Sequence, residues 1–359
     1  MTEFSAATLR LTGLVVLCAL GSTGCEPRDI GEPDPIDGEP EEVRLVCDQE
    51  YLAALTELVE SAEQQLSIVQ WELFQGEATG AVLNRLGEAA DRGVHVQVLL
   101  DDDIEENADG VQWMLDRGID AHLDQDEDVR LHAKMLIADS EMLLIGSTNW
   151  SNSSIRRNRE CNLLAQRPQS AAYLREWFEA LLVNPGNRQP PAAVQDNSGD
   201  FLVVVDDQLL EKLLEQLNSA QSRVDFTLYA TYLQPGNLAS PAMQLFSALT
   251  DAADRGVPVR GIADWSDWNH SNNDSNQDAV NWLRARGVDI RWEDAETTTH
   301  AKIFRIDDGA QVQSANISSG GFRWNREAGG WTKSPSVLDD IDSWFEALWA
   351  ESTVAPVGR

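Results

Sequence analysis

The sequence HAKMLIAD at residues 132–139 returns as HAKIFRID at residues 300–307, and both have the form His-x-Lys-x-x-x-x-Asp. Two shorter motifs follow each copy: a Ser-x-Asn motif (Ser147 and Asn149, then Ser314 and Asn316) and an Asn-Arg-Glu triplet (ending at Glu160 and at Glu327). The step from the asparagine to the glutamate is the same in both, 160 − 149 = 11 and 327 − 316 = 11. One such string can arise by chance. Two with the same polar companions indicate two half-sites that meet in one active site.

The repeat extends beyond these polar motifs. Ala-Ala-Asp-Arg-Gly-Val occurs at residues 89–94 and again at 252–257, an offset of 252 − 89 = 163. The motif histidines are 300 − 132 = 168 residues apart. Nearly constant offsets over this distance indicate the duplication of a unit of about 165 residues.

Helix and strand signals alternate within each copy. In the first copy, helical spacing over 52–59 precedes a strand-like run over 66–73. A helix over 81–92 ending at Gly93, a strand ending at Asp101 and a helix over 110–116 follow, and the second copy repeats the series with its strand ending at Asp264. This alternation predicts an α/β protein made of two duplicated α/β/α sandwich units with mixed sheets, related by a pseudo-two-fold axis and sharing one active site.

The N-terminal stretch predicts export. Arg10 precedes an apolar run over 11–20, and about ten apolar residues are too few to span a bilayer. Small residues then lead to Cys25, which resembles the lipidated cysteine of a bacterial lipoprotein signal; a plain secretory signal with an incidental Cys25 is the alternative. We therefore expect an exported protein that is either anchored to a membrane of the bacterial envelope or secreted.

Composition divides the rest of the chain. We predict a signal peptide at 1–25, a disordered acidic, Pro-rich tether at 26–46, a first unit at 47–184, a linker at 185–200 and a second unit at 201–352. If Cys18 leaves with the signal and Cys25 carries lipid, Cys47 and Cys161 remain. An oxidising compartment would permit these two to pair, and two buried free thiols are the alternative.

The charge balance argues against one class of partner. The chain has 27 basic and 60 acidic side chains and a formal net charge of −33. Loose binding to nucleic acid depends on Lys and Arg contacts to phosphates, so nucleic acid is an unfavourable partner. Two acidic runs, 101–106 and 124–128, are interpreted as solvated loops; a calcium site in the first is the less favoured alternative, because the ordered glycine of a calcium loop is absent.

Tryptophans form a second group with two interpretations. Trp265 and Trp268 follow the strand end at Asp264, and Trp324 and Trp331 flank the second Asn-Arg-Glu triplet. Amphipathic Trp side chains suit a lipid headgroup boundary, and ordinary core packing explains them equally well.

The duplicated motif supplies groups for chemistry at phosphorus. Residues i and i+2 of a strand share a face, so His132 and Lys134 are presented together, as are His300 and Lys302, while Asp139 and Asp307 fall where a turn should follow. One histidine would attack phosphorus and the other would protonate the leaving alcohol, while lysines and asparagines would stabilise the developing charge. We see no His, Cys or carboxylate cluster with metal-ligand spacing, and we expect no cofactor.

These motifs resemble those of the phospholipase D superfamily, whose mark is His-x-Lys-x-x-x-x-Asp followed by Gly-Ser-x-Asn, usually in two copies. The resemblance covers roughly residues 48 to 350, with Gln313 standing where glycine is usual. It implies His132 as the nucleophile and His300 as the acid. It further implies that both motifs are catalytic in full (His132, Lys134, Asp139, His300, Lys302 and Asp307), with supporting residues that bind phosphate or orient the opposite histidine (Ser147, Asn149, Glu160, Ser314, Asn316 and Glu327).

The function implied is that of a phospholipase D: hydrolysis or transphosphatidylation of a phospholipid through a phosphohistidine. A superfamily nuclease, a cardiolipin-synthase-like phosphatidyltransferase and a non-catalytic phosphoanion-binding module are the alternatives. Because both half-sites lie in one chain, we expect a monomer whose partners are a phosphodiester substrate and a membrane surface.

Overall fold

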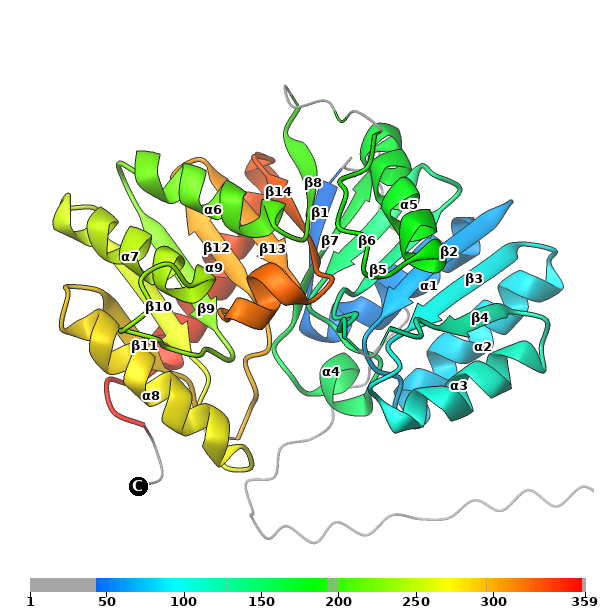
Figure 1. The fold of residues 1–359 in the computed structure, drawn as a ribbon, viewed down its shortest axis with the longest axis horizontal. Coiled ribbons are helices and arrows are strands. Elements are labelled where there is room, and N and C mark those ends of the chain that lie inside the picture. The colour runs from blue at the N-terminus through cyan, green and yellow to red at the C-terminus, as the bar shows by residue number, and fades with distance from the viewer. Residues whose placement is uncertain (1–42, 127, 193–194, 196–198, 295, 357–359) are drawn as a thin grey trace, which may run out of the picture. The chain divides into compact units, whose positions relative to one another are not determined.

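The computed structural model describes residues 43–126, 128–192, 195, 199–294 and 296–356 (Figure 1). The predicted signal peptide, with Cys25, lies outside the described residues, as does the predicted tether up to residue 42. Residues 43–46 of that tether prediction are instead part of a strand that pairs with residues 162–165. The apolar alternation of Val43, Leu45 and Val46, all buried, explains why the folded part begins earlier than the acidic composition suggested.

Two seven-stranded sheets with the same strand order form the centre of the structure. The first has the order β1-β7-β6-β5-β2-β3-β4, with β1 (Val43–Cys47), β2 (Gln65–Gln70), β3 (His95–Leu100), β4 (Asp120–Leu123), β5 (Met135–Ala138), β6 (Met142–Gly146) and β7 (Cys161–Gln166). The second has the order β11-β10-β9-β12-β13-β14-β8, with β8 (Phe201–Val205), β9 (Val224–Leu228), β10 (Val259–Ala263), β11 (Asp289–Trp292), β12 (Ile303–Ile306), β13 (Gly309–Gln313) and β14 (Ala328–Thr332). Each sheet combines a parallel part (β2-β3-β4, β9-β10-β11) with antiparallel neighbours, so the predicted mixed sheets and duplication are confirmed.

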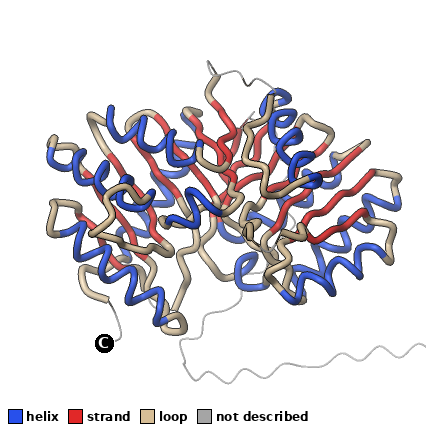
Figure 2. The backbone as a smooth tube through the Cα atoms, in the orientation of Figure 1, coloured by secondary structure: helices blue, strands red, loops and turns tan. Residues whose placement is uncertain are grey.

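Helices cover the outer face of each sheet (Figures 1 and 2). The helices are α1 (Tyr51–Ser61), α2 (Glu77–Asp91), α3 (Glu105–Leu115), α4 (Asn152–Arg156), α5 (Pro168–Val183), α6 (Gln208–Ser219), α7 (Pro241–Asp254), α8 (His270–Arg284) and α9 (Pro335–Glu351), with a 3₁₀ turn at Asp48–Glu50 and a π-helical turn at Gly320–Trp324. α1 and α2 pack on one side of the first sheet, and α6, α7 and α8 share a core with the second. The predicted helices at 81–92 and 110–116 are present but begin earlier, at Glu77 and Glu105. Gly93, which was predicted to end the first of them, has a positive φ of 93°.

The inner faces of the two sheets share one hydrophobic core. It joins Met135 and Ile145 of the first sheet to Ile303 and Val312 of the second, together with residues of α5 and α9 such as Phe178. Since both faces of each sheet are covered, strands such as β5 and β12 are buried along their whole length. Burial on both sides fixes the register of the strands that carry the duplicated motif.

Several predicted surface features are buried instead. Asp101 and Asp124 were expected in solvated loops, but both are buried at strand ends, where Asp101 accepts a hydrogen bond from the Leu131 amide (2.6 Å). Glu105 and Glu106 lie in the first turn of α3, and no group of three or more His, Cys, Asp or Glu in the described residues could hold a metal ion.

The four tryptophans divide evenly between the two interpretations. Trp265 and Trp331 are buried in the core of the second sheet, so ordinary packing explains them. Trp268 and Trp324 are 66% and 61% exposed. These two remain available for a lipid surface.

Candidate active site

The backbone at the start of each histidine motif is hydrogen-bonded to the opposite half of the chain. The His132 amide donates to the Arg326 carbonyl (2.9 Å), and the His300 amide donates to the Arg159 carbonyl (2.9 Å). Parallel bridges join Leu131 to Arg326 and Arg159 to Thr299. The exchange is reciprocal, as a pseudo-two-fold relation between the units requires. It brings the two motifs into one buried site.

The two motif histidines are each held by the glutamate of the other half. His132 Nδ1 lies 2.9 Å from the Glu327 carboxylate, and His300 Nδ1 lies 2.9 Å from the Glu160 carboxylate. All four side chains are at most 6% exposed. Each glutamate therefore contacts the histidine of the opposite half, which is the arrangement that the predicted orienting role requires.

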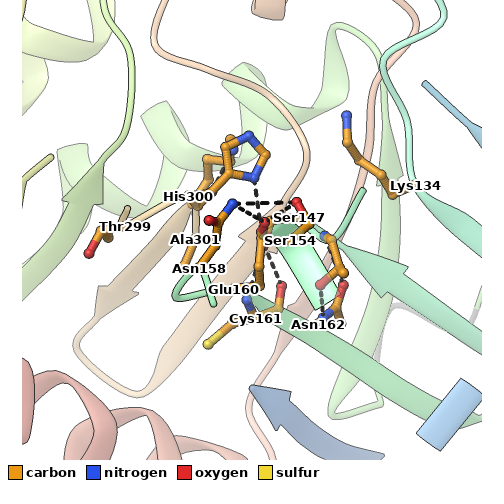
Figure 3. Close-up of polar contacts among 12 residues, drawn as sticks. Lys134, Ser147, Ser154, Asn158, Glu160, Cys161, Asn162, Thr299, His300 and Ala301 are labelled. Carbon is orange, nitrogen blue, oxygen red and sulfur yellow. Dashed lines mark hydrogen bonds and ion pairs between the residues drawn. The ribbon is translucent and has the colours of Figure 1, made fainter. Parts of the chain in front are cut away.

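Each glutamate is fixed in turn by its own half, as Figure 3 shows for Glu160. Ser147 and Ser154 donate to its carboxylate at 2.6 and 2.7 Å. In the second half Ser314 donates to Glu327, as does the Asn325 amide (2.9 Å). The two predicted serines therefore act through the glutamates rather than on a ligand.

The histidines are neutral and point a free nitrogen away from the glutamates. Burial lowers the pKa of His132 and of His300 to about 4, although the paired carboxylates act in the opposite direction. Burial would raise the pKa of both glutamates, yet the facing histidines and lysines hold it below the ordinary value. Because an ionised carboxylate only accepts hydrogen bonds, the imidazole proton lies on Nδ1 and Nε2 keeps its lone pair.

Lys134 and Lys302 complete a cationic pair beside the histidines. Both are 2% exposed, and each ammonium donates to the carbonyl of the histidine two residues before it. Burial lowers the pKa of Lys134 to about 8 and that of Lys302 to about 7, against the attraction of Glu327 and Glu160. Both lysines carry charge below neutral pH, where they can neutralise an anion.

An aromatic ring that the sequence analysis missed covers each His-Lys pair. The centroid of the Trp71 ring lies 4.8 Å from the centroid of the His132 ring and 5.2 Å from Lys134 Nζ. Tyr229 lies 4.4 Å from the His300 ring and 4.8 Å from Lys302 Nζ in the same way. Both rings directly follow equivalent strands, β2 and β9, and this matched position in the repeat was the available signal.

The asparagines present polar groups without partners. The side-chain oxygens of Asn149 and Asn316 are buried and make no hydrogen bond within the described part of the chain. A buried polar atom without a partner is costly, and an amide can exchange its oxygen and nitrogen by a flip. Both amides are thus placed for the phosphate contact that was predicted.

Asp139 and Asp307 are not part of the site, and their predicted catalytic role is corrected. Each follows a four-residue strand that begins after the lysine, so it lies about 16 Å further along the chain. Asp139 has a positive φ of 52° and accepts from the amides of residues 63–65 at 2.7–2.8 Å. Asp307 accepts from the amides of residues 221–223 at 2.8–3.1 Å. The motif aspartates hold turns together.

Glu72 is a further site residue that the sequence analysis did not single out. It directly follows Trp71 and precedes Leu73, which bridges to Trp150, so its half-buried carboxylate lies in the vicinity of Asn149 and Ser151. Burial raises its pKa to about 7, opposed by the attraction of Lys134. A lone glutamate at a strand end carries no motif, so nothing in the sequence marked it.

Cys47 and Cys161 form a disulfide bond, which decides between the two alternatives left by the sequence. They face each other in the antiparallel pair of β1 and β7. The bond lies beside Glu160, whose amide donates to Asp48 (3.0 Å). The disulfide therefore anchors the strand that begins next to the glutamate holding His300.

This fold and this site define a phospholipase D-like protein: two copies of one α/β unit with a composite His-Lys site. Residues 55–182 and 213–349 match the family described as "Cardiolipin synthase, PLD-like domain", and the chain belongs to this family. The two matched segments cover both copies of the repeat.

Curated relatives match over shorter stretches. The chain is 33% identical over 91 residues to the human mitochondrial cardiolipin hydrolase, which is 25% of this chain and 36% of that protein. It is 27% identical over 126 residues to a phospholipase D of Rickettsia prowazekii, 34% of this chain and 59% of that one. The chain thus spans less than two thirds of the length of these relatives.

Among solved structures, the phosphatidylserine synthase of Haemophilus influenzae has a similar fold, with a TM-score of 0.65 at 12% identity, over 88% of this chain and 87% of that one. The polyphosphate kinase of Porphyromonas gingivalis has a TM-score of 0.61 at 13% identity, over 86% of this chain and 47% of that one. At these identities the similarity concerns the fold.

Proposed function

We propose that the chain is a phosphodiesterase of phospholipase D type that cleaves a phospholipid through a phosphohistidine intermediate. The observation that carries the proposal is the crossed pairing of two buried, neutral histidines with the glutamates of opposite halves. Lys134, Lys302 and the two asparagines supply the charge and donors that a phosphodiester needs. The names of the relatives, cardiolipin hydrolase and phospholipase D, support a phospholipid as the substrate class.

In the first half-reaction, His132 Nε2 attacks phosphorus and the bond to the leaving alcohol breaks. Binding of the anionic diester raises the pKa of His300, because it adds a negative charge to the pocket, so that His300 carries the proton that the alcohol receives. Lysines 134 and 302 stabilise the charge that develops on the non-bridging oxygens.

In the second half-reaction, the neutral His300 accepts a proton from water as its oxygen attacks phosphorus. The bond from His132 to phosphorus breaks, and the products are a phosphomonoester and the alcohol released earlier. Glu327 and Glu160 stay ionised and hold the two rings throughout. A second alcohol in place of water gives transphosphatidylation, and the cardiolipin synthase description of the family makes this the second candidate function.

An assay of phospholipid and nucleic acid side by side tests the substrate class. The full chain is incubated with mixed micelles of phosphatidylcholine or phosphatidylethanolamine and, separately, with single-stranded DNA, and the products are analysed by mass spectrometry. We expect phosphatidic acid from the lipids and no DNA cleavage, with no product from His132→Ala or His300→Ala. Cleavage of DNA alone would overturn the lipid assignment. Binding of phosphate without turnover would identify a phosphoanion-binding module instead.

We further propose that the protein is exported, lipidated at Cys25, and monomeric at the membrane of a bacterial envelope. The apolar run over 11–20 and the acidic, Pro-rich stretch after Cys25 support this arrangement. Among the residues that the structure describes, no helix is both long and apolar enough to cross a bilayer. Labelling of producing cells with radioactive palmitate should mark the wild type and leave Cys25→Ser unmarked. Label in both would remove Cys25 as the lipidated residue, and light scattering of the purified chain measures its oligomeric state.

A further inference from the structure

The near-symmetry of the active site is broken at Glu72. The strand pairing aligns the two copies. Ile68 of β2 pairs with Leu136, and Phe226 of β9 pairs with Phe304; Leu136 and Phe304 each lie two residues after a motif lysine. A second comparison uses two isolated bridges. Leu73, just after β2, pairs with Trp150, and Thr231, just after β9, pairs with Ile317; Trp150 and Ile317 each directly follow a motif asparagine. Both registers give the same offset, so the position of Glu72 in the first half is that of Ala230 in the second.

Glu72 places a carboxylate against the phosphate-binding groups of one half only. Its neighbour Leu73 bridges to Trp150, the residue after Asn149, and its other neighbour Trp71 has its ring centroid 5.2 Å from Lys134 Nζ. The carboxylate is therefore attracted by Lys134 and repelled by Glu160. It also influences Tyr229 of the opposite half, so its charge reaches across the site. Unlike Glu160 and Glu327, which are fully buried and bonded to a histidine and a serine, Glu72 keeps part of its surface exposed.

Orienting the asparagine does not explain this carboxylate. Asn316 occupies the equivalent place in the second half, where Ala230 offers no side-chain hydrogen bond. A partly buried acid beside an anion site carries a desolvation cost and repels the phosphate. A cation next to the carboxylate would compensate this cost. A phosphodiester substrate can supply that cation when its alcohol portion carries an ammonium group.

We propose that Glu72 makes the site prefer phosphodiesters whose alcohol carries an ammonium group over those whose alcohol is uncharged. The preference rests on the proposed phosphodiesterase function. The carboxylate attracts the ammonium while Lys134 and Lys302 hold the phosphate, so opposite ends of a zwitterionic headgroup meet opposite charges. Phosphatidylethanolamine has such a headgroup, and phosphatidylglycerol presents an uncharged alcohol at similar size.

The experiment compares these two lipids, with matched acyl chains in the same neutral detergent micelle, as the ratio of their kcat/KM values. Glu72→Gln keeps the size of the side chain and one of its acceptor oxygens, and it removes the charge. We expect the ratio of phosphatidylethanolamine to phosphatidylglycerol to fall about tenfold, the effect of one partly exposed charge pair. Glu72→Asp should retain most of the preference, and Glu215→Gln, on exposed α6, should match the wild type.

A pH series gives a second readout that a structural role would not move. Glu72 ionises as pH rises through about 7, so the wild-type ratio should increase from pH 6 to pH 8, and Glu72→Gln should show no increase. Lys134 titrates in the same range but acts on the phosphate of both lipids, so its effect cancels in the ratio.

The possible outcomes separate this inference from the proposed function. A p-nitrophenyl phosphodiester has no ammonium group, so its rate in Glu72→Gln relative to wild type measures any general effect of the variant on the chemistry, separately from the lipid ratio. An unchanged lipid ratio in Glu72→Gln, or a parallel loss on all three substrates, would overturn the role of Glu72 and leave the phosphodiesterase intact. Failure of the wild type to cleave any diester would overturn both.

Discussion

The His132 imidazole and the Glu327 carboxylate are 195 residues apart in sequence and 2.9 Å apart in the folded chain. The equivalent pair, His300 and Glu160, is 140 residues apart in sequence and also 2.9 Å apart in the fold. Neither half of the chain therefore contains a complete catalytic unit. A histidine without its glutamate would lose both its tautomer and its orientation, so the two units are obliged to work together.

Replacing the two glutamates should separate the two half-reactions. Glu327→Gln frees the ring of the proposed nucleophile, and we expect kcat to fall at least about 100-fold with no phosphoenzyme formed. Glu160→Gln disturbs the proposed acid, which a p-nitrophenol leaving group does not need, so a phosphoenzyme should accumulate. A burst of p-nitrophenol together with the intact mass of the protein measures both. A phosphoenzyme in Glu327→Gln and none in Glu160→Gln would reverse the roles of the histidines.

Asp139 should contribute to stability and not to catalysis. Its three amide partners lie in the segment 63–65, and Asp139→Ala removes the acceptor from all three. We expect a loss of about 2 kcal/mol in the free energy of unfolding with kcat retained, and the same for Asp307→Ala. Chemical denaturation and steady-state kinetics measure the two quantities. Loss of turnover in a well-folded Asp139→Ala protein would return this residue to the catalytic set.

The effect of Asp139 should depend on pH. Burial would raise the pKa of Asp139, but the amides of residues 63, 65 and 64 outweigh it and hold the pKa below the ordinary value. A carboxyl group with a lowered pKa stabilises the fold above its unfolded pKa of about 3.9, and this contribution is lost as pH falls through the folded pKa. The stability difference between wild type and Asp139→Ala should therefore be full at pH 7 and shrink below pH 4. A difference that stays constant would show that the charge is not involved.

The pH profile of kcat/KM should have two limits. With a p-nitrophenyl diester, whose leaving group needs no proton, activity requires a neutral His132 and charged lysines. It should fall as pH drops through about 4, where His132 is protonated, and as pH rises through about 7 to 8, where Lys302 and Lys134 lose their protons. Lys302→Arg, which cannot lose its charge, should move the alkaline limit upwards if it retains activity. An alkaline limit that stays in place would exclude Lys302 as its source.

Removing the disulfide should weaken both the fold and the site. Cys47 and Cys161 are 114 residues apart, and a crosslink closing such a loop stabilises by about 5 kcal/mol in the chain-entropy treatment. We expect the double variant Cys47→Ser with Cys161→Ser to lose up to that amount, measured by denaturation. Because Glu160 precedes Cys161, kcat should also fall. Equal stability of the oxidised and reduced wild-type protein would show that the strand pair does not need the bond.

Much of the architecture could be predicted from sequence because it depends on local patterns. Strand and helix alternation, the glycine after α2 and the duplicated motifs are visible within short windows. They predicted the α/β class correctly, and they predicted two histidines that the structure places in one buried site. Burial is not local. Asp101 and Asp124 were expected in solvent because acidic runs are usually solvent-exposed. In the structure both side chains follow the ends of strands and are buried.

The sequence by itself determined that there are two half-sites, which residue types they hold, and that the chemistry concerns phosphate. Tertiary structure alone decided that the motif aspartates leave the site, that Cys47 meets Cys161, and that Trp71 and Tyr229 cover the histidines. It also showed that the position of Glu72 in the first half is held by Ala230 in the second. The physical reason is that a repeat in sequence specifies equal elements, while the distances between side chains of different elements are set by how the sheets pack and in what register their strands pair.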